Sequence, residues 1–280
     1  MNVTRFAPSP TGYLHLGHAY SALFAKRAAQ DGQFLLRIED IDPVRCKPEF
    51  TQAIFEDLGW LGLNWPQPVR LQSQHINDYA AALDRLKSKG LLYPCFCTRR
   101  EIEQEAQGAA NAPHSDDGTV LYVGTCRHLT EEQRAEKLKQ QGVANWRLDV
   151  TAALKLTGEL FWYDAVKGKI KAQPEMFGDV VLARKDVPTS YHLSVTVDDH
   201  LQGITKVTRG EDLFTATHIH RLLQALLGYE VPDYHHHGLL LDESGRRYAK
   251  RDKSVTLRAL RAQGVTAEDI LLRMSNQQSA

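Results

Sequence analysis

The strongest constraint on the fold is a strand–helix–strand pattern within residues 3–38. Residues 3–6 favour a short strand, and prolines at positions 8 and 10 prevent regular strand pairing beyond it. Apolar and small residues then follow helical spacing over 16–30, and QFLLRI at 33–38 indicates a second strand. Such a βαβ unit binds its ligands beyond the carboxyl ends of its strands. We therefore expect an α/β protein whose ligand site includes the loop before the first helix.

Two histidines lie at the predicted start of that helix, in the sequence His15-Leu16-Gly17-His18. The free backbone N–H groups and the dipole at a helix N-terminus favour an anion. Residues three positions apart also share one face of a helix, so both imidazoles would face the same ligand. The pattern suits polyphosphate binding, although an isolated H-x-G-H fits ordinary polar surface equally well.

The wider stretch RFAPSPTGYLHLGH, residues 5–18, resembles the signature of the class I aminoacyl-tRNA synthetases, and specifically of their glutamyl branch. The family has His-Ile-Gly-His where this chain has His-Leu-Gly-His. The resemblance extends to about residue 258, so it covers nearly all of the chain. It implies a Rossmann-like catalytic domain that is split by an inserted acceptor-binding-type domain. The chain has no G-x-G-x-x-G, which argues against a dinucleotide site.

The order of the other predicted elements agrees with a split domain. The strand–helix rhythm stops between residues 94 and 185, where a glycine- and alanine-rich loop precedes a charged helix capped by Thr130. Outside this section, helices are predicted at 48–58, 79–89, 216–227 and 266–274, and strands at 193–197, 204–207 and 238–241. We expect four parts: a Rossmann-like catalytic domain in two halves (1–92 and 187–243), a zinc-containing α/β insertion of the acceptor-binding type (93–186), and a lysine loop with a short helical segment (244–280).

The composition excludes several classes of protein. The formal net charge of the 280 residues is zero, so any contact with RNA must use local patches rather than a global field. No apolar stretch approaches the roughly 20 residues that a membrane span needs, and the N-terminus lacks a secretory signal. Four cysteines in a chain of this length do not make a disulfide scaffold. We expect a soluble, cytoplasmic monomer without membrane contact.

The second half of the predicted site lies in residues 188–210. In a Rossmann-like frame, Asp198-Asp199-His200 would follow one strand and Arg209 the next, and an arginine fork can hold a carboxylate through two parallel hydrogen bonds. The resemblance assigns Arg5 and Arg209 to the carboxylates of a glutamate substrate and Glu39 to its ammonium group. It adds further glutamate contacts from two loops: Phe6, Ala7, Pro8, Ser9 and Tyr191.

A basic segment, SGRRYAKRDKS at 244–254, follows the last predicted strand. The family has its mobile lysine loop here, with the pattern Lys-Met-Ser-Lys-Ser in the strongest cases. This chain departs from that pattern, since alignment on Gly245 gives Arg247-Tyr248-Ala249-Lys250-Arg251. Lys250 is the predicted phosphate-contacting lysine in this register, whereas an alternative register points to Lys253. Charge runs of this kind are also common as solvated turns.

The resemblance implies that a glutamate carboxylate attacks the α-phosphorus of ATP, which gives an aminoacyl-adenylate and pyrophosphate. Such chemistry depends on positioning and on charge stabilisation at the phosphate oxygens. His15, His18 and Lys250 are the catalytic and ATP-binding candidates, because imidazole N–H groups and an ammonium group can surround the phosphates. Mg²⁺ bound with ATP would bridge the phosphate oxygens.

Three cysteines in the expected insertion, Cys95, Cys97 and Cys126, have a spacing compatible with a structural zinc site. The pattern C-x-C is less specific than a doubled C-x-x-C, because two unrelated buried cysteines can share it. Ordinary zinc chemistry favours His128 as the fourth ligand. The resemblance to a short branch of the family instead favours Tyr122, and Tyr122 is our prediction.

The run His235-His236-His237 resembles a metal-binding cluster in composition. Side chains on an extended segment alternate between its two faces, so three consecutive ones cannot converge on one ion. We therefore predict no metal site there. Cys46 stands apart from the other cysteines and is predicted to be an ordinary thiol.

Few residues follow the basic segment, so the anticodon-reading domain of a glutamyl-tRNA synthetase is not expected. In this respect the chain resembles the truncated glutamyl-queuosine tRNA(Asp) synthetases, which activate glutamate without tRNA and transfer it to queuosine in the anticodon loop of tRNA(Asp). The expected partners are ATP, L-glutamate and queuosine-containing tRNA(Asp). Two alternatives stay open: a compact or fragmentary glutamyl-tRNA synthetase that charges tRNA(Glu), and a non-catalytic RNA-binding protein derived from a synthetase.

Overall fold

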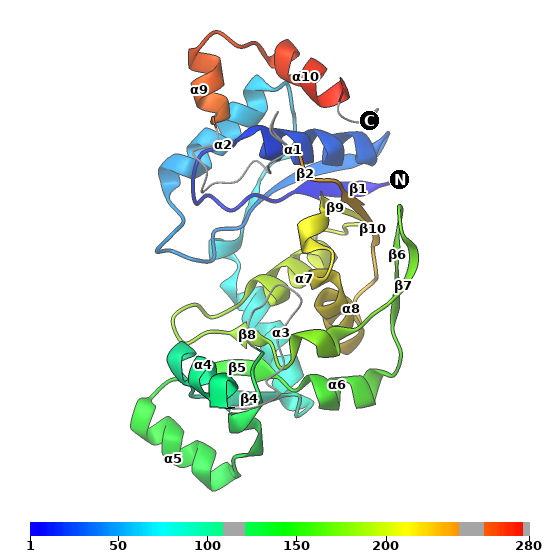
Figure 1. Cartoon of the computed structure of the whole chain (residues 1–280). Coiled ribbons are helices and arrows are strands. Elements are labelled where there is room, and N and C mark those ends of the chain that lie inside the picture. The colour runs from blue at the N-terminus through cyan, green and yellow to red at the C-terminus, as the bar shows by residue number, and fades with distance from the viewer. Residues whose placement is uncertain (109–120, 241–254, 277–280) are drawn as a thin grey trace.

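The computed structural model describes residues 1–108, 121–240 and 255–276, and Figure 1 shows its arrangement of helices and strands. The first sheet is parallel, with the order β1-β2-β3. Its strands are joined through helices, and the bounds are β1 (Val3–Phe6), α1 (Leu16–Ala29), β2 (Gln33–Ile38), α2 (Pro48–Trp60) and β3 (Arg70–Leu71). The predicted βαβ unit and the α/β class are therefore confirmed.

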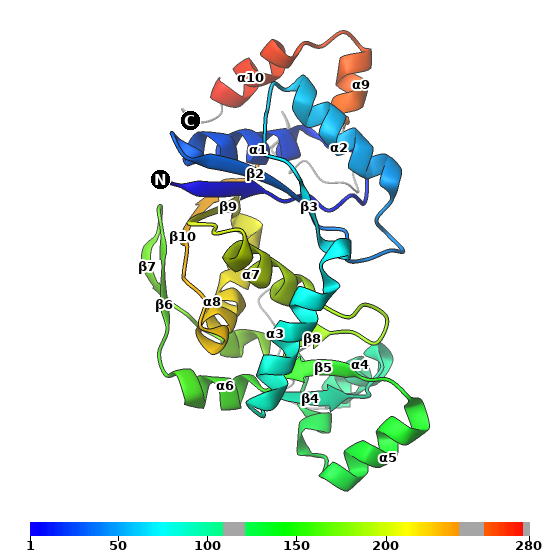
Figure 2. The ribbon, with the colours of Figure 1, turned by 180° about the vertical axis from the view of Figure 1, so that it is seen from behind.

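Helices cover both faces of this sheet (Figures 1 and 2). On one face, α1 and α2 share a buried apolar cluster with the C-terminal helices α9 (Leu257–Ala262) and α10 (Ala267–Asn276). On the other face, a second cluster includes side chains of α3 (Ile76–Ser88), α7 (Tyr191–Leu201) and α8 (Ala216–Leu227). A parallel sheet that is covered on both faces offers a ligand mainly the carboxyl ends of its strands.

A second sheet, with the order β7-β6-β10-β9, lies beside the first. Its strands are β6 (Phe161–Asp164), β7 (Gly168–Lys171), β9 (Lys206–Gly210) and β10 (Asp233–His237). The Thr205 N–H donates to the Val3 carbonyl at 3.0 Å, which places β9 next to β1. β10 runs parallel to both β9 and β6, and Tyr234 pairs with Asp164. The β6–β7 hairpin from the expected insertion therefore extends the sheet that carries β9 and β10.

The remaining part of residues 93–186 forms a separate three-stranded antiparallel sheet, at the bottom of Figure 1. Its strands are β4 (Leu92–Cys95), β5 (Asn145–Leu148) and β8 (Val181–Ala183), and the nearby helices are α4 (Arg99–Gly108), α5 (Glu131–Gln141) and α6 (Val150–Thr157). The predicted cap of α5 is confirmed, because the Thr130 Oγ1 accepts a hydrogen bond from the Gln133 N–H at 3.2 Å.

The predicted strand at 193–197 is wrong, because this stretch belongs to the helix α7. The sequence LSVTV has the β-branched residues typical of a strand, and every residue from Leu193 to Asp199 is buried. A helix that is buried on all sides has no amphipathic period by which to recognise it. The decisive local signal was Ser190, whose Oγ accepts from the Leu193 N–H as the helix N-cap.

Smaller differences concern strand ends. The strand expected at 238–241 is β10 at Asp233–His237, so the three consecutive histidines end the strand instead of preceding it. The strand expected at 204–207 begins at Lys206 and continues to Gly210. Within the described residues, no helix has both the length and the apolar character needed to cross a bilayer.

Candidate active site

A cavity of about 580 Å³ opens where β1, β2, β9 and β10 end, the position expected for the ligand of a parallel α/β sheet. Its wall includes every predicted ATP- and glutamate-site residue that lies in the described parts of the chain: Arg5, Phe6, Ala7, Pro8, Ser9, His15, His18, Glu39, Tyr191 and Arg209. The strands run in the same direction, so their ends meet at one edge although they are far apart in the sequence.

His15 and His18 cap the start of α1 reciprocally. Nδ1 of His15 accepts a hydrogen bond from the Gly17 N–H, and Nδ1 of His18 accepts one from the His15 N–H, both at 3.1 Å. A neutral imidazole whose Nδ1 is an acceptor carries its proton on Nε2. The two rings, whose centroids are 3.8 Å apart, therefore each carry an Nε2–H donor in the wall of the cavity.

Lys250 and Lys253 lie outside the described residues. Before that segment Leu240 lines the cavity, and after it Thr256 forms an isolated β-bridge with His15, which also lines the cavity. The Leu257 N–H also donates to the Leu14 carbonyl at 2.8 Å. Residues from the two ends of the sequence thus meet at the start of α1.

Arg209 is buried near the end of β9, and its guanidinium contacts four side chains. Its Nε lies 3.1 Å from Nε2 of His236. Its Nη1 lies 3.4 Å from the Tyr191 hydroxyl and 3.3 Å from Nδ1 of His220, and its Nη2 donates to the Thr217 hydroxyl. These contacts fix the plane of the guanidinium inside the cavity wall.

None of these four partners is a carboxylate. Burial, reinforced by the charge of Arg209, lowers the pKa of His236 to about 4 and also lowers that of His220, so both rings are neutral near pH 7. Arg209 makes no ion pair with any carboxylate among the residues that the structure describes. A buried cation without a counter-ion is unfavourable, so this side of the cavity favours an anionic ligand.

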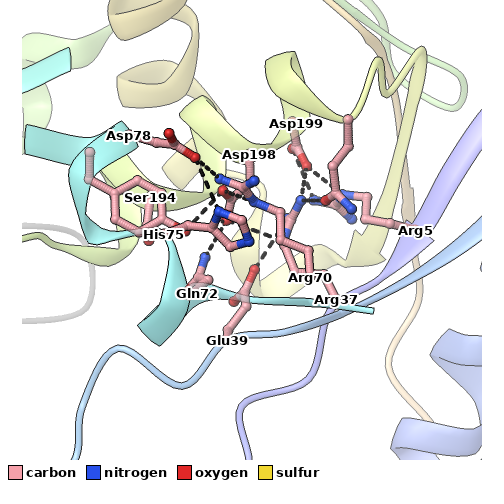
Figure 3. A network of polar contacts seen from close by, with 12 residues as sticks. Arg5, Arg37, Glu39, Arg70, Gln72, His75, Asp78, Ser194, Asp198 and Asp199 are labelled. Atoms are coloured by element: carbon pink, nitrogen blue, oxygen red, sulfur yellow. Dashed lines mark hydrogen bonds and ion pairs between the residues drawn. The ribbon is translucent and has the colours of Figure 1, made fainter. Parts of the chain in front are cut away.

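Arg5 is held differently, in the buried polar network of Figure 3. Its Nε and Nη2 donate to the two oxygens of Asp199 at 2.9 and 3.3 Å. Arg37 donates to the same carboxylate at 2.9 Å and to Glu39 at 3.3 Å. The charge of Arg5 is therefore partly compensated by the protein, and Arg209 is the stronger attractor for an external anion.

Glu39 and Tyr191, which are far apart in the sequence, both line the cavity. Burial raises the pKa of Glu39, and the charges of Arg37 and Arg5 oppose that shift. Burial also raises the pKa of Tyr191, so its phenol keeps its proton and can donate a hydrogen bond. Glu39 offers an acceptor for a cationic group, and Tyr191 offers a donor next to Arg209.

Asp198 and Asp199 were expected to follow a strand at the ligand site. They belong instead to the helix α7, and they are not among the described residues that line the cavity. Asp198 is fully buried and accepts hydrogen bonds from Arg70 Nε at 2.7 Å, Gln72 Nε2 at 2.8 Å and the Tyr79 hydroxyl at 2.9 Å. Asp199 binds the two arginines described above. Both carboxylates therefore hold the framework beneath the cavity and are not placed to bind a substrate directly.

The predicted metal ligands within residues 93–186 lie together. The sulfurs of Cys95, Cys97 and Cys126 are all within 4.8 Å of one another. Cys97 Sγ lies 3.5 Å from Cys126 Sγ and 3.7 Å from the Tyr122 hydroxyl. A tetrahedral site with Zn–S bonds of about 2.3 Å has ligand–ligand distances of roughly 3.8 Å, which these spacings fit. The cluster could therefore hold a metal ion.

Hydrogen bonds at this cluster favour a thiolate at Cys126. Contacts with the thiols of Cys95 and Cys97 lower the pKa of Cys126, and the Phe96 N–H lies 3.4 Å from its sulfur. Tyr122 is buried, and its oxygen accepts from the Cys126 N–H at 2.7 Å. His128 is exposed and is not part of this group. Cys46 lies elsewhere, in the loop before α2.

Several residues that shape the cavity were not found from the sequence: Arg37, Asp164, Thr217, His220 and His236. Apart from the contact of Arg37 with Glu39, the side chains to which they hydrogen-bond lie eight or more residues away, so no local pattern marks the pairs. One signal was available in the histidine run, since strand alternation separates His236 from its neighbours. The rings of His235 and His237 pack on Phe24 of α1, whereas His236 faces Thr217 of α8.

Known proteins resemble this chain over most of its length. Residues 2–275 match the family model described as tRNA synthetases class I (E and Q), catalytic domain. A protein of Rhodobacter capsulatus named glutamyl-Q tRNA(Asp) synthetase is 48% identical over 275 residues, which cover 96% of this chain and 98% of that protein. A protein of Nitratidesulfovibrio vulgaris with the same name is 42% identical, over 95% of this chain and 83% of that protein.

The fold also resembles a solved structure. The crystal structure of a glutamate tRNA ligase from Elizabethkingia meningosepticum, in complex with its amino acid, superposes with a TM-score of 0.72 and 30% sequence identity. The match covers 90% of this chain and 52% of the ligase, so the chain spans about half the length of that protein.

Proposed function

The chain belongs to the class I tRNA synthetases of the E and Q type, and from this premise we propose that it acts as a glutamyl-queuosine tRNA(Asp) synthetase. It activates L-glutamate with ATP without needing tRNA, and it transfers the glutamyl group to queuosine in the anticodon loop of tRNA(Asp). The observation that carries the proposal is the placement of Arg209, a buried cation without a carboxylate partner among the described residues, in the same cavity wall as the two histidine donors.

Glutamate binds on the Arg209 side of the cavity. Arg209 and Arg5 bind its carboxylates, with Tyr191 and Ser9 as further hydrogen-bond donors, and Glu39 receives the ammonium group. The support for these roles is that all five residues line one cavity and that Arg209 lacks a counter-ion within the described parts of the chain. The planar fork of arginine suits a carboxylate through two parallel bonds.

ATP binds on the side of His15 and His18, near the N-terminus of α1. The α-carboxylate oxygen of glutamate attacks the α-phosphorus, the bond to the bridging oxygen breaks, and pyrophosphate leaves. The Nε2–H groups of His15 and His18 donate to phosphate oxygens as negative charge develops there. Lys250 supplies the ammonium group from the C-terminal segment, and Mg²⁺ bound with ATP would neutralise charge on the phosphates.

The second step transfers the glutamyl group. A hydroxyl of queuosine attacks the carbonyl carbon of the adenylate, and AMP leaves. We further propose that Cys95, Cys97, Tyr122 and Cys126 hold Zn²⁺, which would stabilise the fold of this part of the chain. The sulfur spacings, and the hydrogen bonds that lower the pKa of Cys126, support the zinc assignment.

A first experiment measures ATP–pyrophosphate exchange with each amino acid in the absence of tRNA. We expect exchange with glutamate and at most background exchange with glutamine or aspartate. The matched control is the variant Arg209→Met, which keeps much of the side-chain volume but removes the guanidinium. Absence of exchange in the wild-type protein, with or without tRNA, would support a non-catalytic RNA-binding protein instead.

A second experiment identifies the acceptor. Labelled glutamate and ATP are supplied with purified tRNA(Asp) that contains queuosine, with tRNA(Asp) that lacks it, and with tRNA(Glu). We expect label only in the first RNA. Label in tRNA(Glu) would contradict the proposal. It would instead indicate a glutamate–tRNA ligase, the activity for which the structural relative is named.

A further inference from the structure

The contacts of Arg209 continue into the inserted section of the chain. Nε2 of His236, on β10, lies 3.1 Å from Nε of Arg209. Nδ1 of the same ring lies 2.8 Å from Oδ2 of Asp164, the last residue of β6. All three side chains are buried. A continuous buried path therefore joins the β6–β7 hairpin to a residue that lines the cavity.

The direction of each hydrogen bond in this path follows from the chemistry of arginine. A guanidinium has only donors, so Nε2 of His236 must accept from Arg209. The proton of the neutral ring is then on Nδ1, which donates to the Asp164 carboxylate. The same reasoning makes Nδ1 of His220 an acceptor from Arg209, so its Nε2–H donates to Nδ1 of His192 at 3.2 Å.

Asp164 is suited to hold one tautomer of His236. Its Oδ2 accepts from the backbone N–H of His236 at 3.2 Å as well as from Nδ1, and its Oδ1 accepts from the N–H groups of Val166 and Lys167, each at 3.0 Å. Four N–H donors therefore point at one fully buried carboxylate. Burial opposes ionisation of Asp164, but the hydrogen bonds from His236 and the backbone outweigh it and lower the pKa.

A neutral imidazole anchors Arg209 without cancelling its charge. Arg5 shows the alternative, because its Nε pairs directly with the Asp199 carboxylate at 2.9 Å. In Arg209 the Nε–H donates to His236 instead, and the imidazole ring of His236 separates the guanidinium from the Asp164 carboxylate. The guanidinium plane is thereby fixed while its positive charge stays available to a bound anion.

Resting on the proposed function, we propose that His236 and Asp164 are positioning residues for glutamate recognition: they orient the Arg209 fork toward the substrate carboxylate through the path Asp164–His236–Arg209. Asp164 belongs to the β6–β7 hairpin, so the inserted section completes the amino-acid side of the cavity in addition to any contact with RNA. Side chains that support the ligands of metal sites typically change affinity or activity by about 10- to 100-fold when removed, and we expect a similar range here.

Two substitutions at His236 separate its two hydrogen bonds. His236→Gln places an amide oxygen near the position of Nε2 and keeps an acceptor for Arg209. His236→Asn keeps a polar group near Nδ1, toward Asp164, but removes the acceptor. The neighbouring His235→Asn is the matched control, because His235 lies on the opposite face of β10 and packs on Phe24. Each variant is assayed by tRNA-independent ATP–pyrophosphate exchange with glutamate and ATP varied in turn.

We expect His236→Asn to raise the KM for glutamate by about 10- to 100-fold, with the KM for ATP changed by less than about threefold. His236→Gln should recover most of that loss, and Asp164→Asn should raise the KM for glutamate while leaving the KM for ATP similar. The melting temperature of each variant, with and without saturating glutamate, reports folding separately from binding. His235→Asn should show neither change in KM.

The outcomes distinguish this inference from the proposed function. If the wild-type protein exchanges with glutamate but His236→Asn keeps a KM for glutamate within about twofold, the inference is wrong and the function stands. The inference is also wrong if the KM values for glutamate and ATP rise together, or if His236→Gln is as impaired as His236→Asn, since the pair would then act only on folding. A wild-type protein that does not exchange would overturn both.

Discussion

Nη1 of Arg37 lies 2.9 Å from Oδ1 of Asp199, where the Arg37 side chain is fully buried and that of Asp199 is 11% exposed. The same guanidinium also contacts Glu39 at 3.3 Å and Asp198 at 3.6 Å, so one buried cation serves three carboxylates. These pairs join β2 to α7 under the floor of the cavity (Figure 3). Asp199 in turn binds Arg5, which is predicted to bind the substrate glutamate. The position of Arg5 therefore depends on Arg37.

Arg37→Met is therefore expected to destabilise the fold. Removal of Arg37 leaves Glu39 without its direct ion pair and weakens the compensation of Asp198 and Asp199, and breaking a buried pair typically costs about 3–5 kcal/mol. The free energy of unfolding is measured by urea titration at pH 7. The control is Arg45→Met, whose exposed pair with Asp42 should contribute less than about 1 kcal/mol. Equal effects of the two variants would contradict the structural role of the buried pair.

The buried carboxylate of Asp57 should make the stability of the fold depend on pH. Its carboxylate is buried in α2, accepts no hydrogen bond within the described residues and lies 3.9 Å from the Arg261 guanidinium of α9. Burial raises its pKa to about 6 from a usual value of 3.8. The folded state then binds this proton more tightly than the unfolded state, so its contribution to stability is full below about pH 4 and is lost as the pH rises through about 6.

The substitution Asp57→Asn removes that cost of ionisation. We expect it to increase the free energy of unfolding by about 1–3 kcal/mol at pH 8, with the gain shrinking as the pH falls from 6 toward 4. Urea unfolding over this range provides the measurement. The exposed Asp84→Asn is the control and should change stability by less than about 0.5 kcal/mol at each pH. A gain that is independent of pH would show that ionisation of Asp57 is not the cause.

His18 can be tested without loss of the helix cap. His18→Asn keeps an acceptor near Nδ1 for the His15 N–H but lacks the Nε2–H donor. Its melting temperature should stay close to that of the wild type, while kcat for ATP–pyrophosphate exchange falls by about 10²–10³, the usual effect of losing one such donor. The KM for glutamate should change little. A defect confined to the KM for glutamate would contradict the assigned role.

Arg209→Lys is expected to impair glutamate binding although the charge is kept. An ammonium group cannot reproduce the planar fork, nor reach His236, Tyr191 and Thr217 together. The KM for glutamate should rise by at least about tenfold, equivalent to about 1.4 kcal/mol, with the KM for ATP nearly unchanged. Glutamate titrations of the exchange reaction give this value. A KM for glutamate equal to that of the wild type would contradict the role of Arg209 in glutamate binding.

The metal proposal has a direct test. Mass spectrometry under native conditions should find about one Zn²⁺ per chain in the wild type and less in Cys97→Ser, whose melting temperature should also fall. Cys46→Ser is the matched control, since Cys46 lies outside the cluster and its loss should leave the metal bound. The zinc site would be contradicted if the purified wild-type protein contained no zinc and added Zn²⁺ left its melting temperature unchanged.

Local features of the sequence determined the first half of the cavity. The prolines, the spacing over residues 16–30 and the two histidines indicated a βαβ unit with a helix start at its ligand site, because strand and helix periods are properties of neighbouring residues. Arg209 was placed at a strand end for the same reason. Recognition of the family then depended on contiguous motifs, which a single chain displays directly.

Only the tertiary structure decided how these side chains are held and charged. Residues 193–197 of α7 resemble a strand in sequence because burial on all sides removes the period that distinguishes a helix. Asp199 meets Arg5 across 194 residues, and His236 meets Asp164 across 72, so no local pattern relates the partners. The pairing of Arg5 with a carboxylate and of Arg209 with neutral rings follows from those distant contacts. Short-range periodicity therefore indicated the βαβ unit but not the helix α7, whereas the packing of the elements set the charge that each arginine presents to a ligand.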